Sequence, residues 1–183
     1  LENALVPAPS GEDCGDASAL LVRRPRPGPV GVPRAFSSRS SMRLPPYVCA
    51  ILSSPTGHLL VEERPADART AAGQLTCFGG KLEPGETGLD GLLRELREEL
   101  GWQPAEPPRR AVDLHVDGDL IAWFYEAAAP STDAALAFEP GRRGVWMSEA
   151  ELLVHPRLSE WHRAVLNSWR TGRDRADFVT RGA

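Results

Sequence analysis

The sequence has no long hydrophobic run, few cysteines and no excess of basic charge. None of its apolar stretches approaches the ~18 consecutive residues that cross a bilayer, which excludes a membrane-spanning helix. The first residues show no basic segment followed by an apolar run, so we expect no secretory signal. A net charge of −4 at pH 7 argues against a stable nucleic-acid complex through a basic surface.

The three cysteines are too few and too scattered for a disulfide framework, and none belongs to a Cys-x-x-Cys pair that could bind zinc. Cys49 and Cys77 lie in apolar runs, which favours small buried side chains over reactive thiols. This use of cysteine predicts a cytoplasmic protein. The 183 residues, 42% hydrophobic and 25% charged, suit one globular domain with a sizeable core.

Composition divides the chain into three parts. Residues 1 to 45 are rich in Pro, Arg, Gly and Ser and have little periodic apolar content, which predicts a flexible extension. Their six arginines against four acidic residues also allow a basic arm that touches a partner or an anionic substrate. A folded domain is expected over residues 46–171, followed by a polar tail over 172–183.

Short apolar runs between turn signals predict strands over residues 47–52, 58–63, 75–78, 111–116, 119–126 and 145–147. Residues 64–74 lack periodic apolar residues and are expected to form a loop, and residues 158–170 a helix. Strands and helices are mixed without strict alternation. The predicted fold class is therefore α/β, an α/β/α sandwich with a mixed β-sheet.

One segment, residues 88–100, has strong helical periodicity. Its leucines follow the spacing of one helix face, which must be buried: Leu89, Leu92, Leu93, Leu96 and Leu100. Thr87 with Asp90 three residues later predicts a capped start, and Gly101 predicts the end of the helix.

The same helix carries three glutamates, Glu95, Glu98 and Glu99, at spacings that make them neighbours on its surface. Like charges at these spacings repel, so the cluster stabilises nothing by itself. It becomes favourable around a hard divalent cation such as Mg²⁺, which prefers carboxylate and water oxygens and is often completed by substrate phosphates. Taken alone, these glutamates favour a solvated charged face.

Glycines precede this helix. Gly79, Gly80 and Gly85 allow the backbone to approach a ligand closely or to bend sharply. Glu86 then stands at the helix start, where the helix dipole favours a carboxylate.

The whole pattern resembles the Nudix box of the MutT-like hydrolases. Gly80 is followed after five residues by Glu86 and after seven more by the segment from Arg94 to Gly101, and every charged and glycine position agrees. The match covers the 23 residues that end at Trp102, where the family usually has an aliphatic residue. The resemblance implies a Nudix-type α/β/α sandwich with a mixed sheet.

The resemblance also implies an enzyme that hydrolyses a pyrophosphate bond in a nucleoside diphosphate derivative, with Mg²⁺ or Mn²⁺ as cofactor. The implied metal ligands are three carboxylates and one backbone carbonyl: Glu95, Glu98, Glu99 and Gly79. Glu86 would support a metal or its water, and Arg94 would orient the glutamates. Members of the family often form homodimers, although nothing in this sequence determines the oligomeric state.

Roles outside the metal ligands follow less directly. Glu98 is the first choice as general base and Glu139 the second, since the family uses no fixed residue. Lys81 and Arg64 are candidate phosphate ligands. Phe124, with its aromatic neighbours on one strand, is a candidate for stacking on a base, with core packing as the alternative.

The substrate is narrowed by residues around the box. The run from Phe78 to Glu86 resembles enzymes that act on (deoxy)nucleoside triphosphates, which we take as the expected substrates. Residues 115–120 lack the proline typical of ADP-ribose hydrolases and the tyrosine of some dinucleoside polyphosphate hydrolases. The alternatives are ADP-ribose, NDP-sugar or dinucleoside polyphosphate hydrolysis, or a non-catalytic nucleotide-binding domain.

Overall fold

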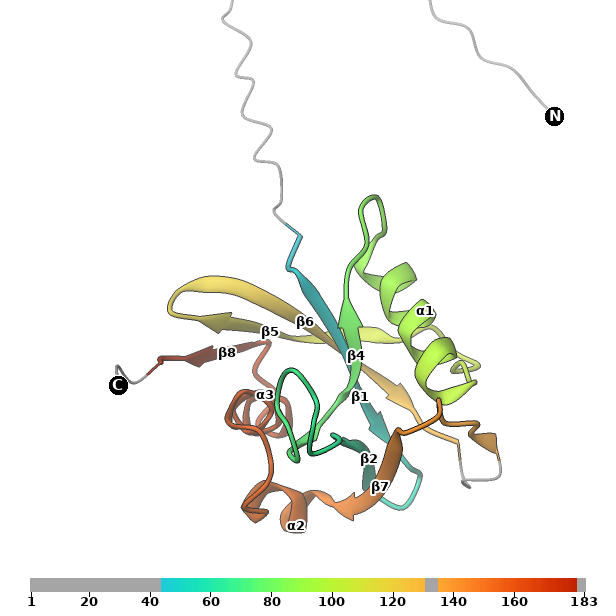
Figure 1. The fold of residues 1–183 in the computed structure, drawn as a ribbon. Helices are drawn as coiled ribbons and strands as arrows, with labels where there is room; N and C mark the ends of the chain where they lie inside the picture. Colours follow the sequence, from blue (N-terminus) through green and yellow to red (C-terminus); the bar gives the residue numbers. More distant parts are fainter. Residues whose placement is uncertain (1–43, 131–134, 181–183) are drawn as a thin grey trace, which may run out of the picture. The chain divides into compact units, whose positions relative to one another are not determined.

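The computed structural model of the chain describes residues 44–130 and 135–180 (Figure 1). The elements in chain order are β1 (Tyr47–Ser53), β2 (His58–Glu63), β3 (Leu75–Thr76), β4 (Phe78–Lys81), α1 (Gly88–Leu100), β5 (Arg109–Val116), β6 (Asp119–Ala128), β7 (Arg143–Ser148), α2 (Glu149–Val154), α3 (Glu160–Arg170) and β8 (Arg175–Phe178). The predicted extension falls outside the described residues up to residue 43. In the described part no helix is long and apolar enough to cross a membrane.

The strands form one mixed sheet in the order β3-β2-β1-β6-β5-β8, with β4 paired to β1 and β7 paired to β2. The pairs β1–β6 and β5–β8 are parallel, and the others are antiparallel. The parallel pairing places Cys49 opposite Phe124, two residues far apart in the sequence. The prediction of a mixed sheet is confirmed.

Two hydrophobic cores lie on opposite faces of the sheet. One contains residues of α2 and α3, including Leu152, Val165 and Leu166, and the other contains the buried face of α1. Figure 1 shows α1 on one side of the sheet and α2 and α3 on the other. This arrangement confirms the predicted α/β/α sandwich.

Helix α1 begins and ends at the predicted residues. The Thr87 hydroxyl accepts a hydrogen bond from the Asp90 N–H at 3.2 Å, and Gly101 ends the helix in the left-handed conformation with φ 57°. The buried stripe is narrower than expected, because only three of the five leucines are fully buried and two are half-buried. The buried ones are Leu92, Leu96 and Leu100.

The strand predicted over residues 75–78 is two strands. β3 pairs with β2, and after Cys77 the chain changes partner, so that β4 pairs with β1. β1 and β2 pair directly only at Leu52 and Ser53 and are separated along the rest of their length. The chain can therefore pair with β2 as β3 and then with β1 as β4. The glycines Gly79 and Gly80 consequently lie inside a strand next to β1.

The expectation of a polar tail after residue 171 is corrected by β8. This strand pairs in parallel with β5, and Ala176 is 3% exposed. Its four residues alternate between charged and apolar, which is the pattern of a strand with one buried face. The segment is too short for that alternation to be conspicuous in the sequence.

Candidate active site

The three glutamates of α1 differ in exposure. The side chain of Glu99 is 2% exposed, that of Glu95 is 13% exposed and that of Glu98 is 57% exposed. The exposure differs because Glu99 lies beside the buried leucine stripe of α1, whereas Glu98 lies away from it. The cluster therefore has an interior part and a surface part.

Strand β4 meets the interior part of the cluster through its glycines. The Gly79 N–H donates a hydrogen bond of 2.9 Å to Glu99 Oε2. A Cβ at Gly80 would collide with the carboxylate of Glu95, so glycine permits this close approach. Gly79 has a φ of 134°, and a Cβ there would collide with the carbonyl oxygen of Val48. The two glycines thus place Glu95 and Glu99 directly against the sheet.

Arg94 joins three acidic residues of the box, Glu86, Glu95 and Glu98. Its Nε donates to Glu86 Oε1 at 2.8 Å, and its Nη1 lies 2.9 Å from Glu95 Oε1 and 3.2 Å from Glu98 Oε2. A further bond of 3.0 Å reaches the backbone oxygen of Lys81. The hydrogen bond from Arg94 holds the pKa of the Glu86 carboxyl below its ordinary value. This geometry supports the orienting role expected for Arg94.

A second arginine, which the sequence analysis missed, contacts the interior carboxylates. Arg142 Nη1 lies 2.8 Å from Glu99 Oε1 and 2.5 Å from Glu62 Oε1, and the Glu62 side chain is 1% exposed. Glu62 also pairs with Arg64 at 3.0 Å and accepts a bond from the Thr76 hydroxyl at 3.3 Å. The clue in the sequence was Glu62 itself, a charged residue directly after the apolar run 59–61 of a predicted strand.

The interior carboxylates are costly to ionise. Burial raises the pKa of Glu99 to about 8, although Arg142 and the Gly79 N–H oppose the shift. Burial also raises the pKa of Glu95, against the opposing hydrogen bond from Arg94. Desolvation disfavours a carboxylate unless positive charge lies close to it. A cation at this point would therefore stabilise both ionised side chains.

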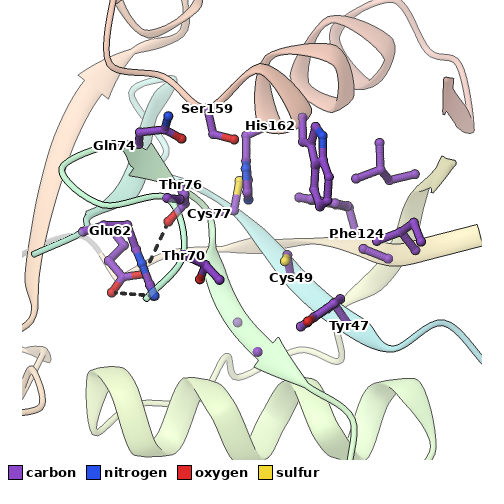
Figure 2. Close-up of a pocket in the computed structure, with 18 of the residues that line it drawn as sticks. Tyr47, Cys49, Glu62, Thr70, Gln74, Thr76, Cys77, Phe124, Ser159 and His162 are labelled. Carbon is purple, nitrogen blue, oxygen red and sulfur yellow. Dashed lines mark hydrogen bonds and ion pairs between the residues drawn. The ribbon is translucent and has the colours of Figure 1, made fainter. Parts of the chain in front are cut away.

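These groups line a cavity of about 790 Å³. Its acidic end is formed by Glu62, Glu95 and Glu99 with Arg64 and Arg142, and its aromatic end by Phe124, Trp161, His162 and Phe178. Figure 2 shows Cys49 and Cys77 between Glu62 on one side and Phe124 on the other. Both thiols are free. Cys77 is buried as predicted and burial raises its pKa to about 12, whereas Cys49 is only half-buried.

The predicted site residues fall into two groups. The cavity brings together six of them: Gly79, Lys81, Glu95, Glu99, Arg64 and Phe124. Glu86, Arg94 and Glu98 lie outside its lining and are linked to it through Arg94. Glu139 is half exposed and accepts a 2.6 Å bond from Arg142 Nε. Their individual roles stay predictions.

Phe124 is less accessible than a base-stacking role requires. It is 1% exposed, and its ring meets His162 edge-on with 5.5 Å between the ring centroids. Trp161 is 37% exposed and lines the aromatic end. Trp161 is therefore the more accessible aromatic surface of the cavity.

The donor set of the acidic end fits a hard divalent cation in kind, since carboxylate oxygens are the ligands that Mg²⁺ and Mn²⁺ prefer. Glu95 and Glu99 also share one wall beside the Gly79–Gly80 backbone. Over residues 44–130 and 135–180, however, no three His, Cys, Asp or Glu side chains are grouped to hold a metal ion. Arg94 and Arg142 hold the relevant oxygens instead.

Comparison with known proteins defines the class to which this fold and site belong. The sequence model of the NUDIX domain matches residues 43–169. This range exceeds half of the chain, and the chain therefore belongs to the NUDIX family. The family resemblance inferred from residues 80–102 is confirmed.

Particular relatives agree with this assignment. The CTP pyrophosphohydrolase of Escherichia coli (strain K12) is 32% identical over 125 residues, which cover 63% of this chain and 84% of that protein. The nucleoside triphosphatase NudI of Enterobacter sp. (strain 638) is 42% identical over 60 residues, 33% of this chain and 42% of that protein. The chain is a hydrolase that acts on phosphoanhydride bonds.

Solved structures show the same fold. The crystal structure of the MutT protein from Methanosarcina mazei Go1 matches with a TM-score of 0.58 and 22% sequence identity. The match covers 68% of this chain and 91% of that protein. The likeness supports the Nudix-type sandwich described above.

Proposed function

We propose that this chain is a metal-dependent pyrophosphohydrolase of (deoxy)nucleoside triphosphates. The observation that carries the proposal is the placement of Glu95 and Glu99 against the Gly79–Gly80 strand, at the wall of a large cavity. Two relatives whose names denote a CTP pyrophosphohydrolase and a nucleoside triphosphatase support the substrate class. The volume of about 790 Å³ lies within the usual range for small-molecule sites.

The acidic end is where we place the cofactor. Mg²⁺ or Mn²⁺ held by Glu95, Glu99 and Glu98 with the Gly79 carbonyl would offset the charge of the phosphates and make water more acidic. Arg94 holds Glu95 and Glu98 in orientation through its two ion pairs. Glu98, the most exposed of the three glutamates, is our candidate to accept the proton of the attacking water.

The remaining lining suits a nucleotide that lies along the cavity. Lys81 and Arg64 contribute positive charge to its wall, where phosphate oxygens need partners. The aromatic end offers apolar area for a base, with Trp161 exposed and Phe124 forming the wall behind it. We therefore place the triphosphate at the acidic end and the base at the aromatic end.

A substrate panel tests the proposal. Purified chain is incubated with Mg²⁺ or Mn²⁺ and each (deoxy)nucleoside triphosphate, ADP-ribose, an NDP-sugar and a dinucleoside polyphosphate, and released phosphate and pyrophosphate are measured. We expect pyrophosphate from nucleoside triphosphates and turnover that is lost with EDTA. Tight nucleotide binding without turnover of any compound would contradict the proposal and indicate a binding domain.

The Glu98→Gln variant tests the first choice of base. Its turnover should fall by roughly 10²–10⁴-fold with the fold intact, because an amide cannot accept the proton. Glu106→Gln removes a carboxylate from an exposed loop position and should leave turnover unchanged. Wild-type turnover in Glu98→Gln would contradict the assignment of Glu98 as the base and would favour Glu139.

A further inference from the structure

Arg142 occupies an unusual position in this site. One nitrogen of its guanidinium, Nη1, bridges Glu62 and Glu99, whose side chains are 1% and 2% exposed. Buried carboxylates need a compensating positive charge, because desolvation penalises the ionised form. Arg142 supplies that charge from a loop outside the Nudix box.

The backbone of that loop is fixed to the end of α1. The Ala137 and Glu139 N–H groups donate to the carbonyl oxygens of Leu100 and Glu99, at 2.8 and 3.0 Å. The Arg142 N–H in turn donates to the Glu139 oxygen at 2.9 Å, which closes a turn. The loop therefore holds the base of the Arg142 side chain in place beside Glu99.

Arg142 and a divalent cation need the same atoms. Glu99 Oε2 accepts the Gly79 N–H at 2.9 Å, and Glu99 Oε1 is bound by Arg142 at 2.8 Å. Both oxygens of this carboxylate are thus engaged. A metal ion bound at Glu99 Oε1 would lie close to the Arg142 guanidinium, and repulsion between the two cations favours displacement of the guanidinium from that oxygen.

We propose that Arg142 is a built-in counter-cation that neutralises Glu99 in the metal-free protein and exchanges with the divalent cation for that carboxylate. This inference rests on the proposed metal binding at Glu99. Glu62 keeps Arg142 nearby after the exchange, because the 2.5 Å pair with Glu62 does not involve Glu99. Arg142 is accordingly a positioning residue that sets how tightly the site binds its metal.

Metal affinity gives the direct test. Mn²⁺ is titrated calorimetrically into the full chain after EDTA treatment and dialysis, for the wild type and for Arg142→Gln. The variant should bind Mn²⁺ roughly tenfold more tightly, because no charged hydrogen bond has to be broken first. In EDTA the Tm of Arg142→Gln should be lower than that of the wild type. Mn²⁺ should raise the Tm of the variant by more than it raises the Tm of the wild type.

Two control variants separate exchange at Glu99 from a general change of charge. Arg64 lines the same cavity and pairs with Glu62, and no contact between it and Glu99 is present in the described structure. Arg143 is 76% exposed and pairs with Glu63 at 3.4 Å. Arg64→Gln and Arg143→Gln should therefore change Mn²⁺ affinity far less than Arg142→Gln. Equal gains in all three variants would overturn the proposal.

A measurement on the wild type covers the case in which Arg142→Gln fails to fold. The side-chain Nη1–H signal of Arg142, which reports the contact with Glu99 and is assigned by its absence in Arg142→Lys, is followed by NMR during titration with Mg²⁺. We expect the signal to shift as the site saturates, and an unchanged signal at saturation would overturn the exchange. Wild-type protein that binds no Mn²⁺ would overturn the proposed function and this inference together. Wild-type protein that binds Mn²⁺ with the same affinity as Arg142→Gln would overturn the inference alone.

Discussion

Two adjacent glycines of β4 are needed for different physical reasons. At Gly79 the φ of 134° and the nearby Val48 carbonyl oxygen both exclude a side chain. At Gly80 the obstacle is the end of the Glu95 side chain, which can move. Gly79 is therefore needed for the fold, and Gly80 is needed for the position of Glu95, a proposed metal ligand.

Alanine substitutions should separate these effects. Gly79→Ala should lower the free energy of unfolding by more than ~2 kcal/mol, because backbone atoms must shift and the residue adopts a strained φ. Gly80→Ala should remain folded and lose most of its hydrolytic turnover, because Glu95 is displaced. Urea unfolding and pyrophosphate release measure the two quantities. Equal destabilisation by both substitutions would contradict this distinction.

His162 introduces a pH dependence of stability. Its Nδ1 is buried without a hydrogen-bond partner, and burial with the nearby charge of Arg64 lowers its pKa from 6.5 to about 4. Between pH 6.5 and about pH 4 the imidazole is protonated in the unfolded chain but stays neutral in the folded protein. Stability from this residue is therefore complete above pH 6.5 and is lost as the pH falls toward 4.

Unfolding at several pH values tests the contribution of His162. As the pH falls from 6.5 to 4, the free energy of unfolding of the wild type should decrease by on the order of 3 kcal/mol more than that of His162→Gln. The other titrating groups affect both proteins equally. His58 is an exposed histidine, and His58→Gln should keep the wild-type dependence. A His162→Gln curve parallel to that of the wild type would show that the imidazole is not buried in its neutral form.

At the scale of elements, the helices differ in how they begin. Thr87 caps α1 with its hydroxyl, whereas Ser159, at the corresponding position of α3, makes no side-chain cap hydrogen bond. The cap of α1 satisfies a backbone N–H that has no partner within the helix. The order of the helix that carries the glutamates thus depends partly on an exposed threonine.

Alanine at the two cap positions should have unequal effects. Thr87→Ala should lower the free energy of unfolding by about 1 kcal/mol. Ser159→Ala removes no cap bond and should cost clearly less. Denaturant unfolding of both variants under the same conditions gives the comparison, and a larger loss for Ser159→Ala would refute it.

At the scale of the whole molecule, the sheet is completed by the last strand of the chain. β8 pairs with β5, and Phe178 meets Trp161 with 6.3 Å between ring centroids at the aromatic end of the cavity. The Thr180 N–H donates to Asp117 Oδ1 at 3.0 Å beyond the strand. Residues well outside the Nudix box therefore support the proposed substrate cavity.

Truncation tests the contribution of β8. A chain ending at Gly172 should lose roughly 2 kcal/mol or more of unfolding free energy, because the apolar side chains of β8 and their neighbours become exposed. A chain ending at Thr180 keeps the strand and its link to Asp117, and it should be as stable as the full chain. Equal stability of the two truncated chains in urea would contradict a structural role for β8.

Local patterns in the sequence were sufficient for much of this protein. The limits of α1 and its caps follow from interactions between residues close in the chain, and the family follows from the motif of residues 80–102. The parallel pairing of β1 with β6 and the change of partner at Cys77 do not, because they join distant segments. The short strand β8 carries too few residues for its period to be recognised.

The sequence by itself determined which residues form the acidic helix and which chemistry they suit, because helix spacing is a local property of the chain. Only the tertiary structure decided that Glu99 is buried, that Glu98 is exposed and that Arg142 bridges Glu62 and Glu99. Arg142 lies 80 residues from Glu62 in the chain. Such contacts arise when the sheet and the end of α1 come together, and no periodicity in either segment encodes them.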